Sequence, residues 1–155
     1  MVRLLRLRLG EPLQFKRMKF DDLYWTFCSW GFALKPEYYQ RFKVYFEDML
    51  IRRRVICFQN DDGLVAVLTF FLTRDHETLA NKPEFATPQD DELGSEIYID
   101  KMICKKWDLK LRKAMQELVE TVYPNVQMGF WHRQPDNRCV VTYKRGTKYA
   151  GKDTK

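Results

Sequence analysis

The strongest hydrophobic pattern in the chain spans residues 96–131. Apolar and polar residues alternate over residues 96–100, and the apolar run continues to Cys104, which predicts a strand. Apolar residues then recur at spacings of three and four until Pro124, which predicts a helix that stops at the proline and has Asp108 as its N-cap. The predicted buried stripe of this helix consists of Trp107, Leu111, Ala114 or Met115, Leu118 and Val122. Alternation returns over residues 126–130 and predicts a second strand. A strand, a helix and a strand joined this closely imply a right-handed crossover and a parallel pair.

The same two patterns predict the elements on either side of this unit. Alternating leucines indicate a strand near residues 5–9, and helical spacing indicates helices near residues 21–30 and 36–50. The stretch Asn60-Asp61-Asp62-Gly63 has the composition of a hairpin turn, because Asn, Asp and Gly tolerate positive φ. The remaining predicted strands cover residues 55–59, 64–72 and 139–143.

This element order predicts an α+β fold. It has two N-terminal helices and a mostly antiparallel sheet with one central parallel β-α-β unit. At this length we expect one domain over residues 1–145, followed by a basic flexible tail over residues 146–155. Residues 73–95 contain two prolines and six acidic residues without clear periodicity. We therefore expect this segment to be a long acidic loop that is either mobile or functional.

Charge is unevenly distributed along the chain. Residues 1–60 carry 12 basic and 6 acidic side chains. Residues 61–100 carry 2 basic and 10 acidic side chains, and residues 101–155 carry 13 basic and 5 acidic ones. An acidic middle therefore lies between two basic ends. Basic ends attract phosphate groups or acidic protein surfaces, so the basic ends are candidates for nucleic-acid or protein contacts.

Composition excludes several classes of protein. No apolar run approaches the ~20 residues of a membrane span, and the N-terminus lacks the pattern of a signal peptide, so we expect a soluble, cytoplasmic protein without membrane contacts. The spacing of the four cysteines matches neither a zinc signature nor a disulfide framework. With only two histidines, no metal is expected, and buried reduced thiols are the favoured interpretation.

The element order over residues 2–143, with the unit at 96–131 in its centre, resembles the GNAT superfamily of acetyltransferases. In that family the fourth strand leads into a helix, and the fifth strand splays away to admit acetyl-coenzyme A. Small GNAT-like proteins also occur among bacteriophage head and virion components. The resemblance lies in layout rather than in motif, and it implies a single GNAT-like domain.

The phosphate-binding turn departs from the family pattern. The family has a Q/R-x-x-G-x-G/A turn, whereas the corresponding residues 104–111 contain no glycine, and side chains with a Cβ crowd such a turn. The resemblance makes Lys105, Lys106 and Lys110 candidate contacts for the cofactor phosphates. Their ordinary interpretation is a solvated face on a basic protein. No cofactor is therefore expected, and acetyl-coenzyme A is expected only if the chain is an enzyme.

The resemblance also implies catalytic candidates. The family often takes its general base from the fourth strand, where Glu96 and Asp100 lie, and its acid from a tyrosine in a helix after the fifth strand. No room for that helix remains here, and Tyr143 is the nearest tyrosine. Alternation with Ile97 and Ile99 puts both carboxylates on a solvent face, which is the interpretation we favour.

Aromatic residues give the second predicted helix apolar character on more than one face. The residues concerned are Tyr38, Tyr39, Tyr45 and Phe46. Such a helix is typical of a protein interface, so a protein partner, an assembly or a homo-oligomer is expected.

Three functions follow from the sequence. The first is a GNAT-like binding or structural module without the usual phosphate turn, plausible in a bacteriophage or mobile element and located in the host cytoplasm or the virion. The second is an active N-acetyltransferase with a divergent cofactor turn. The third is nucleic-acid binding, for which the candidate phosphate contacts are Arg6, Arg8, Arg52, Arg53 and Arg54.

Overall fold

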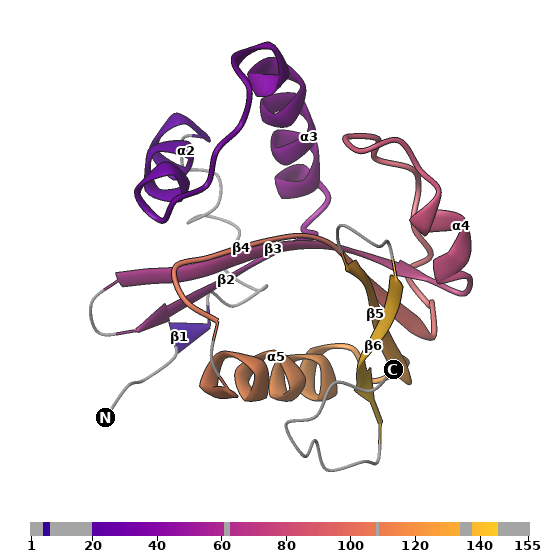
Figure 1. Cartoon of the computed structure of the whole chain (residues 1–155). Coiled ribbons are helices and arrows are strands. Elements are labelled where there is room, and N and C mark those ends of the chain that lie inside the picture. The colour runs from indigo at the N-terminus through magenta and orange to yellow at the C-terminus, as the bar shows by residue number, and fades with distance from the viewer. Residues whose placement is uncertain (1–4, 7–19, 61–62, 108, 134–137, 146–155) are drawn as a thin grey trace. The chain divides into compact units, whose positions relative to one another are not determined.

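The computed structural model has a mixed α+β fold with a mixed sheet (Figure 1). Its described strands follow the order β1-β2-β3-β4-β5-β6, so neighbours along the chain are also neighbours in the sheet. Contacts group the residues into two compact units that divide β3 and β4 between them. The structure describes residues 5–6, 20–60, 63–107, 109–133 and 138–145.

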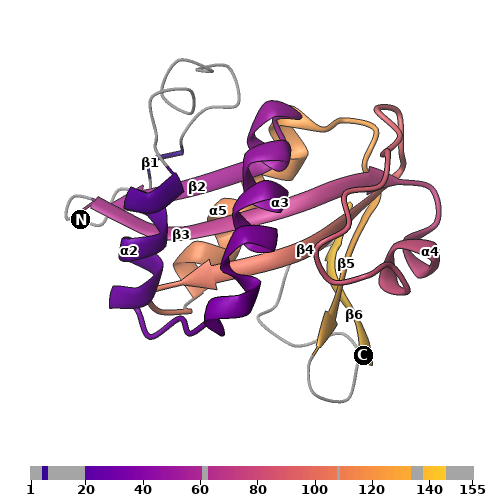
Figure 2. The ribbon, with the colours of Figure 1, turned by 90° about the horizontal axis from the view of Figure 1, so that it is seen from above.

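The first unit combines a β-hairpin with two main helices. Antiparallel pairing joins β1 to β2 and β2 to β3. Two views show α2 and α3 over the same face of the β2–β3 hairpin (Figure 1 and Figure 2). The elements are β1 (Leu5–Arg6), α2 (Phe20–Ser29), the 3-10 helix η1 (Pro36–Tyr38), α3 (Tyr39–Ile51), β2 (Val55–Asn60), and parts of β3 (Gly63–Thr73) and β4 (Glu96–Cys104).

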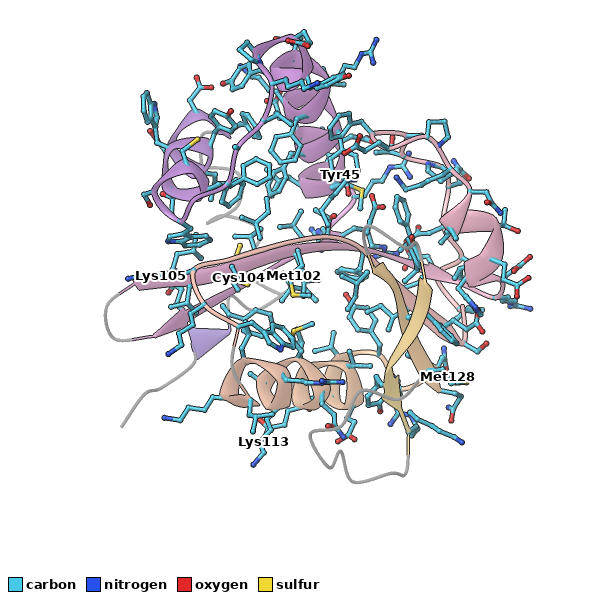
Figure 3. All side chains as sticks on the ribbon, in the orientation of Figure 1. Tyr45, Met102, Cys104, Lys105, Lys113 and Met128 are labelled. Atoms are coloured by element: carbon cyan, nitrogen blue, oxygen red, sulfur yellow. The ribbon has the colours of Figure 1, made fainter. Side chains whose placement is uncertain are left out.

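An aromatic core holds the first unit together. The ring of Phe42 lies 5.6 Å from that of Phe20 and 5.9 Å from that of Phe46, centroid to centroid. Tyr45 points from α3 toward the strands (Figure 3), where its hydroxyl forms a hydrogen bond with the Thr69 hydroxyl on β3. Phe42, Tyr45 and Phe46 are each only 1% exposed, so these aromatic residues form core rather than surface.

This burial places Tyr45 and Phe46, two of the four aromatic residues that predicted an interface, in the core of the first unit. Tyr45 and Phe46 are buried, and Tyr39 donates a hydrogen bond to Asp21 of α2, which raises the pKa of Tyr39 to about 12. Tyr38 is 37% exposed, and its ring lies 6.5 Å from that of Phe85. Most of the aromatic residues that predicted a partner therefore pack against, or form hydrogen bonds with, other residues of this chain.

Both main helices of the first unit end in a left-handed residue. Gly31 has φ +91° just after α2, where glycine is the residue best suited to that conformation. After α3 the left-handed residue is Arg53, with φ 59°. The N–H groups of Arg53 and Arg54 donate to the carbonyls of Leu50 and Met49, at 3.1 and 2.9 Å. Arg53 therefore adopts this conformation without the freedom of glycine.

The second unit contains the parallel pair that the sequence predicted. β4 pairs in parallel with β5, and β5 pairs antiparallel with β6. The β4–β5 register joins Glu96 to Met128, Ile97 to Gly129 and Tyr98 to Phe130, and extends no further along the described residues. The remaining elements are α4 (His76–Ala80), α5 (Leu109–Val122), β5 (Met128–Arg133) and β6 (Arg138–Lys144), together with the rest of β3 and β4.

The helix α5 differs from its prediction at the first turn. Leu111, Ala114 and Leu118 are buried as the spacing predicted, but Trp107 precedes the helix and is 44% exposed. The placement of Trp107 on the buried stripe was therefore wrong. Asp108, a predicted N-cap, lies outside the described residues. None of the described helices is both long and apolar enough to cross a membrane.

The acidic segment 73–95 is more ordered than its composition predicted. In the second unit it forms α4, capped by Asp75, whose side chain accepts a hydrogen bond from the N–H of Glu77. A hydrogen bond from the Thr78 hydroxyl lowers the pKa of Asp75. Gly94 packs so tightly that an added Cβ would lie 2.5 Å from the backbone nitrogen of Thr73. The prediction of an irregular loop throughout this segment was therefore wrong.

The part of the segment that belongs to the first unit, residues 83–87, is also anchored. The Phe85 ring lies 5.8 Å from that of Phe42 and 6.0 Å from that of Tyr45. The Arg52 guanidinium donates to the carbonyl of Thr87 at 2.8 Å. Aromatic packing and a charged donor therefore fix these five residues against α3.

Candidate functional site

A row of polar side chains lies along β4 in the second unit. Glu96, Tyr98 and Asp100 are two residues apart, so they share one face of the strand. Each carboxylate contacts a nitrogen of a residue in the segment 76–82. Tyr98 lies between them and is 6% exposed. We call these residues, with the two partners described next, the β4 polar row.

One end of the β4 polar row is a histidine–glutamate pair. Oε1 of Glu96 accepts a hydrogen bond from the backbone N–H of His76 at 3.0 Å and lies 3.2 Å from Nδ1 of the His76 ring. The His76 ring stacks on Phe130, with centroids 3.7 Å apart and planes at 10°. The side chains of His76 and Glu96 are 19% and 18% exposed. The imidazole is therefore fixed in position and in plane, with part of the pair open to solvent.

The other end is a buried ion pair. Nζ of Lys82 lies 3.0 Å from Oδ2 of Asp100, and the two side chains are only 7% and 6% exposed. The ammonium also lies 5.7 Å from the centre of the Phe71 ring. Removing two charges from water is costly, and the mutual attraction of the two partners offsets part of that cost.

These contacts overturn one interpretation of the sequence. Glu96 and Asp100 were expected on a solvent face, opposite Ile97 and Ile99. Ile97 and Ile99 are indeed buried, but both carboxylates are also largely shielded by α4 and Lys82. Apolar and polar residues do alternate along β4, but other parts of the chain shield both faces of the strand from solvent. Such shielding of both faces is common next to a parallel pair.

Tyr143, the third catalytic candidate, lies on β6 opposite Gly129 of β5. The residue is 5% exposed, and its hydroxyl has no hydrogen-bond partner within the described residues. Burial raises the pKa of Tyr143, while the nearby Arg145 guanidinium acts in the opposite direction. Arg145 itself is held by the carbonyls of Val126 and Tyr123, at 2.7 and 3.0 Å. The Tyr143 hydroxyl is thus buried rather than presented to a ligand in solvent.

The three candidate cofactor lysines lie in two different units. Lys105 and Lys106 follow β4 in the first unit, and both are exposed. The backbone N–H of Lys105 donates to the carbonyl of Val65 at 2.8 Å, which ties the turn to β3. Lys110 is exposed in the first turn of α5, in the second unit.

The arginine triplet after α3 has three different environments. Arg52 forms an ion pair with Asp48 at 3.1 Å, and Arg54 is 5% exposed, whereas Arg53 is exposed. Arg52 is thus engaged by side-chain and backbone partners at the end of α3. Arg6 lies in β1, but its side chain is not described, and Arg8 lies outside the described residues.

Among the side chains that the structure describes, neither the cysteines nor a cluster of metal-ligand residues adds a further site. Cys28, Cys57 and Cys104 are free thiols, and burial raises the pKa of Cys57 to about 12. A thiol in that state is a poor nucleophile near neutral pH. Across the part of the chain that the structure describes, no group of three or more His, Cys, Asp or Glu side chains is arranged to hold a metal ion.

Sequence reasoning missed His76 and Lys82 because both lie in the segment expected to be irregular. A five-residue helix carries too little periodicity to be recognised by its apolar spacing. The usable signal was Asp75, an N-cap residue directly before His-Glu-Thr-Leu-Ala. Even so, the partners of α4 lie about 20 residues further on, a distance that no local pattern encodes.

The β4 polar row can hold a proton or a polar ligand at one end only. Lys82 and Asp100 are closed off, whereas His76 retains a ring nitrogen beyond its bond to Glu96. Comparison with known proteins adds no relative: neither a family model, nor a curated protein, nor a solved structure matches this chain.

Proposed function

We propose that this chain is a GNAT-like domain that acts as a binding or structural module and does not use acetyl-coenzyme A in the usual way. Its setting would be a bacteriophage or another mobile element, with the protein in the host cytoplasm or the virion. The observation that carries the proposal is the occupation of both β4 carboxylates. Glu96 is bonded to His76 and Asp100 to Lys82, at 3.2 and 3.0 Å.

This occupation matters because a general base must have a free lone pair within reach of its substrate. Asp100 is 6% exposed and already neutralises an ammonium group, so a substrate amine would have to displace Lys82. Oε1 of Glu96 already contacts two nitrogens of His76, the backbone N–H and Nδ1 of the ring. The acid candidate, Tyr143, has its hydroxyl buried. The chemical groups that the resemblance implies are therefore engaged or enclosed.

The layout supports the GNAT-like part of the proposal. The strand order and the parallel β4–β5 pair fit the resemblance. Within the described residues, β5 pairs with β6 along its whole length but with β4 at only its first three positions. A fifth strand that leaves the fourth after a short pairing is the feature that admits the cofactor in the family. The glycine-free turn at residues 104–107, with the bulky Trp107, opposes cofactor entry by the usual route.

Calorimetric titration with acetyl-coenzyme A and with coenzyme A tests the proposal directly. We expect no saturable heat at low or moderate salt from protein that gives a cooperative unfolding transition. Micromolar binding that persists at moderate salt, or acetyl transfer to any amine, would overturn it. The double variant Lys105→Ala with Lys106→Ala is titrated in parallel as a control. Weak binding that is lost in this variant and at moderate salt arises from surface charge alone.

The second candidate function is an active N-acetyltransferase, and the short β4–β5 pairing is the observation that favours it. In that case Lys105 and Lys106 contact the phosphates, and their joint replacement by alanine weakens cofactor binding by about 1–3 kcal/mol. Unchanged affinity in the double variant would exclude this placement of the cofactor.

A structural module needs a partner, so we propose a protein assembly or a homo-oligomer as the state in which the domain works. Light scattering after size-exclusion chromatography gives the mass of the particle in solution. A mass above that of the 18.7 kDa chain supports self-assembly. A monomer directs the search to a different protein.

A further inference from the structure

The exposed side of α5 carries a stripe of charged side chains. They follow one another at spacings of three, four and three residues, which places them on a single side of the helix. The buried side of the helix is a different one, formed by Leu111, Ala114, Leu118 and Val119. All members of the stripe are exposed, and Lys113 extends outward from the helix (Figure 3). We call this set the α5 charged stripe: Lys110, Lys113, Glu117 and Glu120.

The order of charges along the α5 charged stripe does not stabilise the helix itself. Both lysines lie in the N-terminal half and both glutamates in the C-terminal half, whereas the helix dipole favours acidic groups at the start and basic groups at the end. The first turn of α5 has no acidic residue, and its last turn has no basic residue. Lys113 and Glu117 are four residues apart, but with the lysine first, which is the less favourable orientation for a pair within a helix.

The charges of the stripe also lack ion-pair partners in the part of the chain that the structure describes. None of its four side chains lies within ion-pair distance of another described residue. Glu120 accepts a hydrogen bond from Nε2 of Gln116, at 3.5 Å. The arrangement of two lysines followed by two glutamates is therefore explained neither by the helix dipole nor by contacts of the described residues.

The α5 charged stripe is complementary to itself in the antiparallel direction. Lys110 and Glu120 lie five residues before and after position 115, and Lys113 and Glu117 lie two residues before and after it. In a second α5 that runs antiparallel and is centred at the same level, each lysine therefore lies opposite a glutamate of the other helix. The spacing of three, four and three is also that of the seam along which two helices pack. A parallel arrangement would instead place lysine against lysine and glutamate against glutamate.

Exposed apolar surface lies at the N-terminal end of the stripe. Leu109 is 58% exposed in the first turn of α5, and Trp107 just before the helix is 44% exposed. Exposed ion pairs are individually weak, so apolar contact at the ends of a helix pair would add to its stability. Association that depends on exposed charges is screened by salt.

We propose that α5 pairs with α5 of a second copy of this chain, antiparallel and about a twofold axis at the level of Met115. The same surface then contacts itself, as in the isologous interface of a twofold dimer. The inference rests on the proposed homo-oligomer, for which it names the contact surface. It does not depend on the fate of acetyl-coenzyme A, so binding of that cofactor would overturn the proposed function and leave the pairing of α5 to be judged separately.

Light scattering after size-exclusion chromatography of the full chain is the first test. At low salt and high protein concentration, we expect a mass approaching twice that of the 18.7 kDa chain. At high salt we expect the mass of a single chain, because the paired charges are screened. A single-chain mass at every concentration and salt would overturn the pairing.

Charge reversal on the stripe is the decisive test. Lys110→Glu with Lys113→Glu makes the stripe entirely acidic, and Glu117→Lys with Glu120→Lys makes it entirely basic. Each double variant should self-associate at least about tenfold more weakly, because like charges then face one another. An equimolar mixture of the two should recover the dimer, since acidic and basic stripes are complementary. The variant with all four reversals is again complementary to itself and should also form a dimer.

A matched control changes the same amount of charge away from α5. Lys35→Glu with Arg41→Glu replaces two exposed basic residues of the first unit, so it should leave the dimer mass unchanged. A cooperative unfolding transition, followed by circular dichroism, identifies the variants that are folded. The variant with all four reversals guards against a trivial loss of the dimer, because it carries every substitution and is still expected to associate.

Two further results would overturn the pairing of α5. One is a dimer that persists in both double variants, which would preserve the proposed homo-oligomer but place its interface elsewhere. The other is a folded variant with all four reversals that stays a single chain under conditions in which the unmodified protein is a dimer.

Discussion

The two units of this protein are stabilised in contrasting ways. In the first, rings of α2, α3 and residue 85 pack on one another, and most of the buried contacts are apolar. In the second, the strand β4 carries the Lys82–Asp100 ion pair and the His76–Glu96 hydrogen-bonded pair, both mostly shielded from water. Truncating an apolar core residue lowers the free energy of unfolding in proportion to the volume removed. Removing either partner of a buried ion pair lowers it strongly, because the other charge stays buried without compensation. The comparison predicts different tolerance to substitution in the two units.

Truncation in the aromatic core should have the largest effect. Phe42 is 1% exposed, so Phe42→Ala should lower the free energy of unfolding by about 3–5 kcal/mol, since it removes apolar contacts and leaves a cavity. Phe42→Leu keeps most of the volume and should cost clearly less. Urea unfolding measures both. Equal losses in the two variants would mean that volume does not govern this core.

Lys82→Met should cost about as much, roughly 3–5 kcal/mol, because it leaves the Asp100 carboxylate buried without its cation. The double variant Lys82→Met with Asp100→Leu should recover most of that loss, since no uncompensated charge remains. Urea unfolding of both proteins decides the matter. A double variant as unstable as the single one would show that the segment depends on these two side chains for more than charge.

Gly94→Ala should destabilise the second unit by about 1–3 kcal/mol, because the new Cβ forces the backbone of Thr73 to move. The matched control is Ser95→Ala, one residue further along the same segment. Thermal unfolding followed by circular dichroism compares the two. A neutral Gly94→Ala protein would mean that the close contact with β3 is dispensable.

Tyr143→Phe should stabilise the protein by about 1 kcal/mol, because it removes a buried hydroxyl that has no partner among the described residues. Burial raises the pKa of Tyr143 above the ordinary value of 10.0. The folded protein then keeps the proton when the unfolded chain releases it, so stability should fall as pH rises above about 10. Unfolding measured from pH 8 to 11 should show a smaller decline in the variant, whereas a destabilised variant would reveal a partner for the hydroxyl.

Arg53→Gly should have the smallest effect, a gain of up to about 1 kcal/mol, because glycine adopts the left-handed conformation without the penalty paid by a side chain. Arg53→Ala removes the same side chain but keeps the Cβ, so it should show no gain. Chemical unfolding resolves a difference of this size when the two variants are compared in parallel.

Much of the fold could be predicted from the sequence because its elements have strong periods. The helical spacing of α3, the hairpin of β2 and β3, and the parallel pair of β4 and β5 on either side of α5 were all predicted within a few residues. Local amphipathic patterns report which face is buried, but not what covers it. For that reason Trp107 was misplaced, and the cover over Glu96 and Asp100 was missed.

The candidate site was predicted only in part. Glu96 and Asp100 were identified on β4, but the residues that complete the pairs, His76 and Lys82, lie in a segment whose composition predicts a loop. Their pairing with β4 is a tertiary interaction over roughly 18 to 20 residues, and neither hydrophobic period nor charge pattern encodes it. Asp75 as an N-cap was the single local sign of a helix there.

The way that the segment after β3 is tied down has a consequence for amide hydrogen exchange. The N–H of Leu72 donates to Asp90 at 3.2 Å, and the N–H of His76 donates to Glu96 at 3.0 Å. Both amides are thus protected by carboxylates that come 18 and 20 residues later, rather than by a neighbouring strand or helical turn. Local opening that separates these carboxylates from the two amides exposes the amides to solvent without melting any ladder. Exchange at Leu72 and His76 would therefore act as a built-in reporter of this opening, visible before the protein unfolds.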